Sequence, residues 1–123
     1  MTEARNTKYF NMLHAIAECN EPVRGFRHSS ALIIGNQIVS VGRNKLKSHP
    51  LQKQFGKNDK CIFLHSEVDC IINALRHVEV DDLNRATLYI LRLNNRGQRG
   101  NSAPCSGCLK AIIHFGIKNV VTT

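Results

Sequence analysis

The stretch CIFLHSEVDCIINAL, residues 61–75, decides the fold because an apolar run changes there into an amphipathic segment. Its later apolar side chains recur at steps of three and four residues, which is the spacing of one face of a helix: Val68, Ile71, Ile72 and Leu75. We therefore expect a helix whose first turn carries two side chains capable of chemistry, His65 and Glu67.

A second helix is predicted over PCSGCLKAIIHFG, residues 104–116. Proline is tolerated in the first turn of a helix and glycine is favoured at its end, so Pro104 and Gly116 suit the two ends. Cys105 and Cys108 lie three residues apart, and both sulfurs can therefore point the same way from one helical turn. Two thiolates at this spacing can bind one metal ion, but they can also act as a redox dithiol.

The other segments alternate between helical and β-type patterns. We expect a first helix, a hairpin around Gly35-Asn36, and two further strands, at residues 3–20, 30–42, 85–93 and 117–121 respectively. The basic stretch 43–60 contains Pro50 and Gly56 and is predicted to be a long loop, and residues 94–103 a second loop. Strands alternating with helices predict an α/β sandwich whose strands are at least partly parallel.

Length and composition set the scale of the protein. With 123 residues, 42% of them apolar and 21% charged, residues 1–123 are expected to fold as one soluble domain. No apolar run approaches the roughly 18 residues of a membrane span, and the N-terminus has no apolar signal-peptide region. We therefore expect a cytoplasmic protein without a membrane partner.

The net charge of +8 and the pI near 9.6 favour an anionic partner, whether a nucleotide, a nucleic acid or a host polymer. The cations that could bind phosphate cluster in the predicted loop, although a solvated surface explains them equally well: Arg43, Lys45, Lys47, Lys53, Lys57 and Lys60. Five cysteines without an export signal favour thiols and metal over a disulfide framework. Cys19, Cys61 and Cys70 are interpreted as small buried residues.

His65 is the residue that distinguishes a metal site from a redox dithiol at Cys105 and Cys108. If both predicted helices pack side by side with their N-termini level, His65, Cys105 and Cys108 converge on one point. Two cysteines and one histidine leave the fourth position of zinc open, which is the catalytic arrangement; structural zinc needs four protein ligands, and the chain has no second CxxC. Glu67 turns away from the ligand direction and is expected to act as a base rather than a ligand.

The motifs HSE at 65–67 and PCSGC at 104–108 together resemble the His-x-Glu and Pro-Cys-x-x-Cys signature of the zinc-dependent cytidine and deoxycytidylate deaminase superfamily. Residues 108–121 are similar to the end of deoxycytidylate deaminases in particular. Ser66 stands where the family commonly has alanine. The resemblance implies a three-layer α/β sandwich with helices on both faces of a mixed sheet of about four strands.

The resemblance also implies a role for each matched residue. His65, Cys105 and Cys108 would bind Zn²⁺, and Glu67 would shuttle protons while the amino group of cytosine leaves as ammonia. Asn44 lies in a VGRN segment that looks like the family's Gly-x-Asn, and it would contact the sugar or base. The implied enzyme converts a cytosine nucleoside or nucleotide to the uracil product, with deoxycytidylate favoured.

Two other functions stay open at this point. A nucleic-acid editor acting on cytosine or adenine would suit the basic charge, but the chain has no aromatic-rich platform for bases, and Ala103 replaces a glutamate usual in transfer-RNA adenosine deaminases. A non-catalytic, zinc-stabilised binding module would not need an intact Glu67. His28 and His49 are placed in loops near the expected pocket.

The assembly is predicted from the end of the chain. It stops at Thr123, directly after the fourth predicted strand, whereas relatives generally continue to a further helix and strand. An exposed sheet edge is a template for pairing with another chain. We therefore expect a homo-oligomer in which a neighbouring subunit completes the edge.

Overall fold

The computed structural model describes residues 2–22, 25–55 and 63–123. Its helices are α1 (Thr2–Glu18), α2 (Pro50–Phe55), α3 (Ser66–Ala74), the 3₁₀ helix η1 (Val80–Arg85) and α4 (Ser106–His114). Its strands are β1 (Arg27–Ile34), β2 (Gln37–Arg43), β3 (Lys45–Ser48), β4 (Phe63–Leu64), β5 (Ala86–Leu93), β6 (Arg99–Gly100) and β7 (Asn119–Thr122). Within these residues, no helix is both long and apolar enough to cross a membrane.

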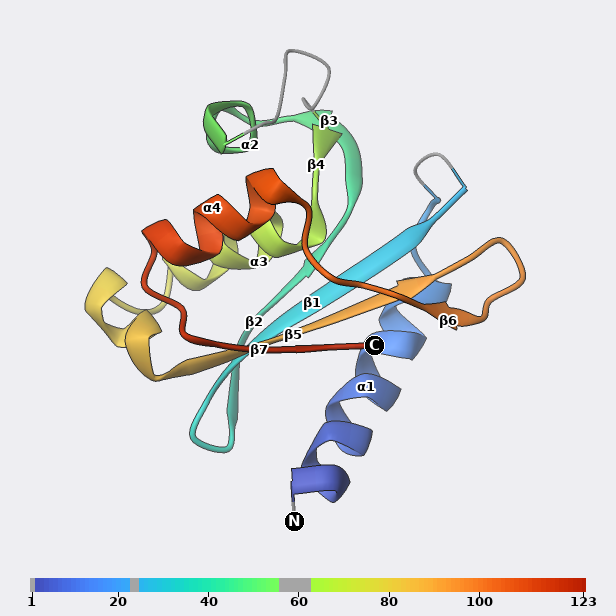
Figure 1. The fold of residues 1–123 in the computed structure, drawn as a ribbon, viewed down its shortest axis with the longest axis horizontal. Coiled ribbons are helices and arrows are strands. Elements are labelled where there is room, and N and C mark those ends of the chain that lie inside the picture. The colour runs from blue at the N-terminus through green and yellow to red at the C-terminus, as the bar shows by residue number, and fades with distance from the viewer. Residues whose placement is uncertain (1, 23–24, 56–62) are drawn as a thin grey trace.

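The main sheet is mixed and has β1 and β5 at its centre. Its order is β2-β1-β5-β6, and β7 pairs with the same strand β5 as β6 does (Figure 1). Among the described strands of this sheet, only the β5–β7 pair is parallel; β1 runs antiparallel to both β2 and β5, and β6 runs antiparallel to β5. The predicted hairpin is confirmed, and the sheet has five strands instead of about four because β6 forms within the predicted loop 94–103.

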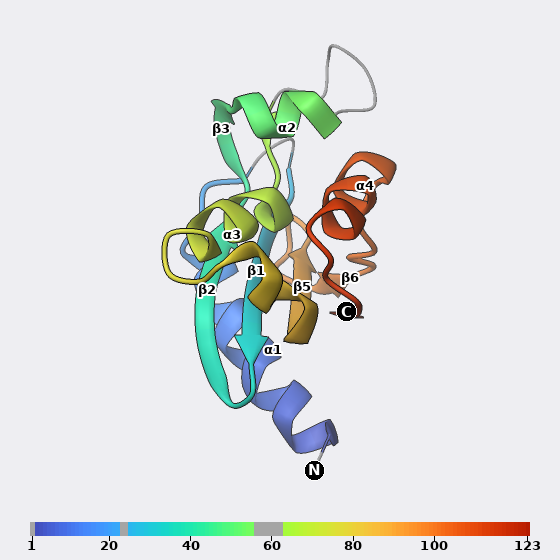
Figure 2. The ribbon, with the colours of Figure 1, turned by 90° about the vertical axis from the view of Figure 1, so that its left-hand side faces the viewer.

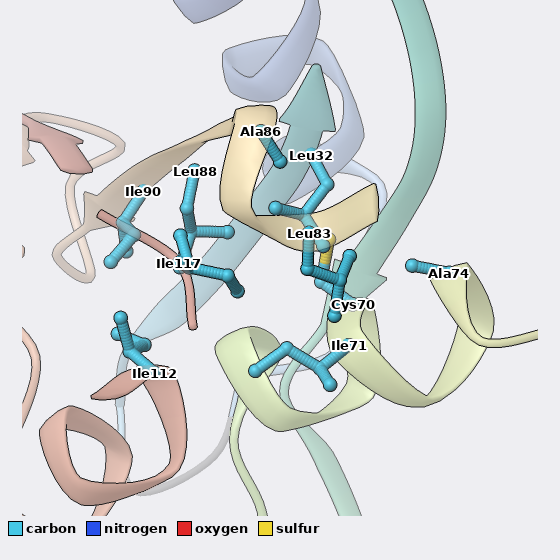
Figure 3. Close-up of a cluster of buried hydrophobic side chains, with 10 residues drawn as sticks. All are labelled: Leu32, Cys70, Ile71, Ala74, Leu83, Ala86, Leu88, Ile90, Ile112 and Ile117. Atoms are coloured by element: carbon cyan, nitrogen blue, oxygen red, sulfur yellow. The ribbon is translucent and has the colours of Figure 1, made fainter. Parts of the chain in front are cut away.

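Helices cover both faces of this sheet, as expected. Figures 1 and 2 show α1 on one face and α3 with α4 on the other. Alternate residues of β5 serve the two layers: Leu88 and Ile90 pack toward α3 and α4, whereas Tyr89 and Leu91 pack with α1. Figure 3 shows the first of these clusters, in which Ile112 of α4 also lies. The three-layer sandwich is therefore confirmed.

The first turn of α3 lies directly against β2 because of a glycine. A Cβ atom on Gly42 would clash with the Ser66 carbonyl oxygen and the Cys70 nitrogen, both backbone atoms. No side chain larger than hydrogen fits there without moving the helix. Gly42 thereby sets how closely the beginning of α3 approaches the sheet.

The predicted loop 43–60 is wrong in its described part, which contains β3 and α2. Pro50 begins the helix α2 instead of interrupting structure, a position that suits proline because the first turn needs no amide donor. The strand β3 pairs with β4, but its four residues are too few and too lysine-rich for their periodicity to reveal them. Gly56, Lys57, Lys60 and Cys61 lie outside the described residues.

Two further cysteines test the expectation of buried thiols. Cys70 is fully buried in α3, as predicted. Cys19 is exposed, and its predicted burial is wrong. It comes directly after α1 ends at Glu18, so the helical periodicity that buries Leu13 and Ala17 does not extend to it.

Candidate metal centre

His65 and Cys105 occupy equivalent positions, each immediately before a helix. His65 is the N-cap of α3 and Cys105 is the N-cap of α4, and both have extended backbone dihedrals. The Cys105 sulfur accepts a hydrogen bond from the Cys108 backbone N–H at 3.4 Å, which fixes the first turn of α4. The sequence placed His65 and Pro104 inside the first turns, whereas the helices begin one and two residues later, at Ser66 and Ser106.

The two helices bring the three predicted ligands together. In Figure 1, α3 and α4 lie side by side over the sheet with their first turns at the same end. The Nδ1 atom of His65 lies 3.1 Å from the Cys108 sulfur and 3.6 Å from the Cys105 sulfur. All three donor atoms lie within 4.8 Å of one another. The predicted convergence of these side chains is thus present in the structure.

The donor set suits a tetrahedral zinc ion. Zn–S bonds of about 2.3 Å and Zn–N bonds of about 2.0–2.1 Å place tetrahedral ligand atoms roughly 3.5–3.8 Å apart. The observed Nδ1-to-sulfur distances of 3.1 and 3.6 Å are close to this range. Two sulfurs and one imidazole nitrogen also match zinc chemically, and they leave a fourth position for water or substrate.

Hydrogen bonds inside the cluster already favour a thiolate. Bonds from the Cys108 thiol and from His65 lower the pKa of Cys105 to about 3. The bond to Cys105 raises the pKa of His65, and the same partner together with burial raises the pKa of Cys108. These shifts favour a thiolate at Cys105 beside a protonated His65 imidazole, and a bound metal ion would replace the protons that these groups share.

Glu67 is buried beside the cluster but is not one of the three clustered donors. Its side chain is 4% exposed, and its Oε1 atom accepts a hydrogen bond from the Ser66 hydroxyl at 2.8 Å. Burial raises its pKa, so this carboxylate takes up a proton more readily than an exposed one does. A carboxyl group that readily takes a proton is suited to general acid–base chemistry.

A pair of serines connects Glu67 to the sheet, and the sequence did not reveal it. The Ser66 hydroxyl lies 2.7 Å from the Ser30 hydroxyl of β1, and both residues are fully buried. The only signal was Ser66 itself, in place of the family's usual alanine. Its hydroxyl orients the carboxylate from a fixed point on the strand.

Asn44 is largely buried, and its side chain is occupied by the protein. Its Oδ1 atom accepts hydrogen bonds from the Asn20 amide at 2.7 Å and from the His28 backbone N–H at 3.0 Å. Its Nδ2 atom donates to the Phe26 carbonyl at 3.1 Å. These contacts fasten the start of β1 to the segment after α1. Contact between Asn44 and a substrate stays a prediction.

A pocket of about 240 Å³ opens beside Asn44. Its lining contains none of the three clustered donors: Cys19, Asn20, Glu21, Arg43, Asn44, Lys45 and Leu46. The Lys45 ammonium forms an ion pair of 3.1 Å with Asp69 of α3, so this cation of the predicted phosphate cluster is already neutralised.

The two histidines assigned to loops have different surroundings. His28 belongs to β1 and not to a loop, because its strand begins at Arg27. Burial, followed by the nearby charges of Arg92 and His65, lowers the pKa of His28 to about 4. His49 precedes α2, and its Nδ1 atom accepts a hydrogen bond from the Leu51 backbone N–H at 3.0 Å, which caps that short helix.

Comparison with known proteins agrees with this geometry. The family model of the cytidine and deoxycytidylate deaminase zinc-binding region matches residues 4–123. No curated protein is similar to the chain at a significant level.

Solved structures show the same fold at low sequence identity. The dCMP deaminase of cyanophage S-TIM5 in its apo form is 19% identical, with a TM-score of 0.58 over 98% of this chain and 79% of that chain. The structure of the same enzyme in complex with dCMP and dUMP is 18% identical, with a TM-score of 0.59 over the same shares of the two chains. A mutant cytidine deaminase from Mycobacterium tuberculosis is 16% identical, with a TM-score of 0.51 over 93% of this chain and 84% of that chain.

Proposed function

This chain belongs to the cytidine and deoxycytidylate deaminase family, and we propose that it hydrolyses a cytosine nucleotide, deoxycytidylate in preference, to the uracil product and ammonia. One observation carries the proposal: His65, Cys105 and Cys108 converge beside a buried carboxyl, Glu67. We also infer that residues 1–123 act as one catalytic domain, since the family match spans 4–123.

The three clustered side chains are assigned to Zn²⁺. When bound in such a site, zinc lowers the pKa of a coordinated water to about 7 and so supplies a nucleophile at neutral pH. The chain contributes the geometry, since two helix N-termini hold His65 and Cys105 and their dipoles favour the thiolates.

Glu67 is assigned the movement of protons. It takes one proton from the attacking water, delivers it to N3 of the cytosine ring and then assists departure of the amine. One water is consumed and one ammonia is released, so the C–N bond at C4 is replaced by a carbonyl. The hydrogen bond from Ser66 keeps Oε1 fixed, which leaves the other carboxyl oxygen for the reaction.

Deoxycytidylate is favoured for two reasons. The C-terminal sequence is similar to deoxycytidylate deaminases, and one solved relative of the same fold carries dCMP and dUMP. The net charge of +8 suits a phosphorylated substrate, but it equally supports a second candidate function, deamination of cytosine or adenine in nucleic acid.

We assign the active form to a homo-oligomer. Among the described residues, β7 pairs with β5 alone, so its other edge is available. Val120 on this strand and Ile113 on the neighbouring α4 are both exposed, at 37% and 68%. A second copy covering this edge would bury both side chains.

The test is ammonia release, with the accompanying ultraviolet change, from cytidine, deoxycytidine, deoxycytidylate and a cytosine-containing oligonucleotide assayed in parallel with zinc-loaded protein. We expect the fastest turnover with deoxycytidylate. Turnover of the oligonucleotide alone would make the protein an editor. Bound zinc without turnover of any substrate would make it a binding module.

A further inference from the structure

Three side chains share the sheet face that leads into the metal centre. His28 of β1 lies opposite Arg92 of β5 in the antiparallel register, just as Ser30 lies opposite Ile90. Residues two apart on a strand share a face, so His28 and Ser30 of β1, like Arg92 and Ile90 opposite them on β5, point toward the layer of α3 and α4. Of these, Ser30 already contacts the start of α3 through Ser66.

This register places His28 and Arg92 in front of the helix N-termini. Ser30 lies beneath Ser66, the first residue of α3, and two residues along a strand span about 7 Å. His28 and Arg92 therefore lie roughly 7 Å along the sheet from the point where α3 begins, on the side of its N-terminus. The lowered pKa of His28, to which the charges of both Arg92 and His65 contribute, agrees with this position.

Among the described residues, Arg92 is a positioned cation that forms no ion pair with a carboxylate. Its guanidinium carbon lies 3.8 Å from the centre of the Phe26 ring, and its Nη1 donates to the Asn101 carbonyl at 3.2 Å. In the described ranges, the ion pairs join Glu18 to His14, Asp69 to Lys45 and Asp82 to Arg85. Stacking and one hydrogen bond thus fix the guanidinium plane while most of its N–H donors stay available.

From this arrangement we propose that Arg92 binds the phosphate of a nucleoside 5′-monophosphate whose base lies at the metal centre. A fixed guanidinium binds phosphate through two parallel hydrogen bonds, and it suits that role better than a lysine. The inference rests on the proposed deaminase function and makes it more specific. It also moves phosphate recognition from the basic segment 43–60, where Lys45 is paired with Asp69, to the end of β5.

The test compares a nucleotide with its nucleoside in three proteins: the wild type, Arg92→Gln and Arg92→Lys. We expect Arg92→Gln to lower kcat/KM for deoxycytidylate by about 30-fold or more and to change that for deoxycytidine by less than about threefold. Arg92→Lys keeps the charge but cannot form the two parallel hydrogen bonds of a guanidinium, so we expect an intermediate loss in kcat/KM for deoxycytidylate, mainly through a higher KM. Arg96→Gln removes an equal charge from an exposed site and should change neither substrate.

Calorimetric binding of the products, deoxyuridylate and deoxyuridine, provides a readout without turnover. We expect the wild type to bind deoxyuridylate more tightly, and Arg92→Gln to abolish that difference. An equal loss for nucleotide and nucleoside, or no loss for either, would overturn the role of Arg92 while leaving the deaminase function intact. Absence of turnover with the binding difference still dependent on Arg92 would instead refute the deaminase function and support the phosphate site.

Discussion

The two faces of the sheet differ in what they bury. On the α1 face, buried aromatic and aliphatic side chains such as Tyr9 and Leu13 pack together, and the polar Ser29 only donates its hydroxyl to the Leu13 carbonyl. On the α3 and α4 face, the buried groups include two carboxyl side chains, Glu67 and Asp69. The α1 face therefore stabilises the sheet by apolar packing. On the α3 and α4 face, helix N-termini hold titratable groups that would otherwise be costly to bury.

The largest effect is expected when two buried cysteines on the α3 and α4 face are replaced in turn. Cys108→Ala should abolish stoichiometric zinc binding and reduce deaminase turnover by about a thousandfold or more, because zinc loses one of three protein ligands. Cys70→Ala is the matched control, since Cys70 is equally buried but contacts Ser40. Zinc content by elemental analysis checks both variants. Equal zinc loss in both would contradict the assignment of ligands.

The converse test is made on the α1 face. Leu13→Ala should lower the free energy of unfolding by about 3 kcal/mol, because a fully buried side chain leaves a cavity. The folded variant should still bind one zinc ion. Thr7→Ala on the exposed side of α1 should change stability by less than about 0.5 kcal/mol. Denaturant unfolding with zinc analysis measures both quantities, and loss of zinc from folded Leu13→Ala would show that the two faces are not independent.

A smaller effect is expected at the buried carboxyl. Burial raises the pKa of Glu67, so its contribution to stability is present below its ordinary pKa of 4.5 and is lost as pH rises through the folded value. In metal-free protein, Glu67→Gln should therefore raise the free energy of unfolding at pH 8 by about 1 kcal/mol or more. The gain should disappear near pH 4. A gain that does not change with pH would show that the carboxylate charge is not its cause.

A further effect of similar size concerns His28. Its pKa is lowered to about 4, so its contribution to stability is present above the ordinary pKa of 6.5 and is lost as pH falls toward 4. The wild type should lose on the order of 1–2 kcal/mol over this window, and His28→Gln should lose less. Urea unfolding at several pH values would decide this, and identical pH profiles would count against the half-buried, neutral imidazole.

The parts of the fold that the sequence predicts well are those with long, regular periodicity. The apolar steps in residues 66–74 define α3, and the spacing of Cys105 and Cys108 places both sulfurs on one turn of α4. These two helices carry the whole ligand set, so the metal centre could be predicted as well. The remaining error was of one or two residues, because a cap lies outside the periodic pattern.

Other features depend on contacts that no local pattern contains. The short strands β3 and β6 exist because partner strands lie beside them, and their few residues carry no periodic signal. The position of Arg92 opposite His28 depends on the register between β1 and β5. Likewise, Asn44 was expected to face a substrate, and only the structure reveals its internal hydrogen bonds.

The assignment of Zn²⁺ to His65, Cys105 and Cys108 and of proton transfer to Glu67 is tested by ammonia release from deoxycytidylate by wild type and Glu67→Gln protein, each with its zinc content determined in the same sample. We expect one zinc ion per chain in both proteins and turnover only in the wild type, because Cys105, Cys108 and His65 bind the metal while Glu67 moves the protons. Unchanged turnover in zinc-loaded Glu67→Gln would contradict it.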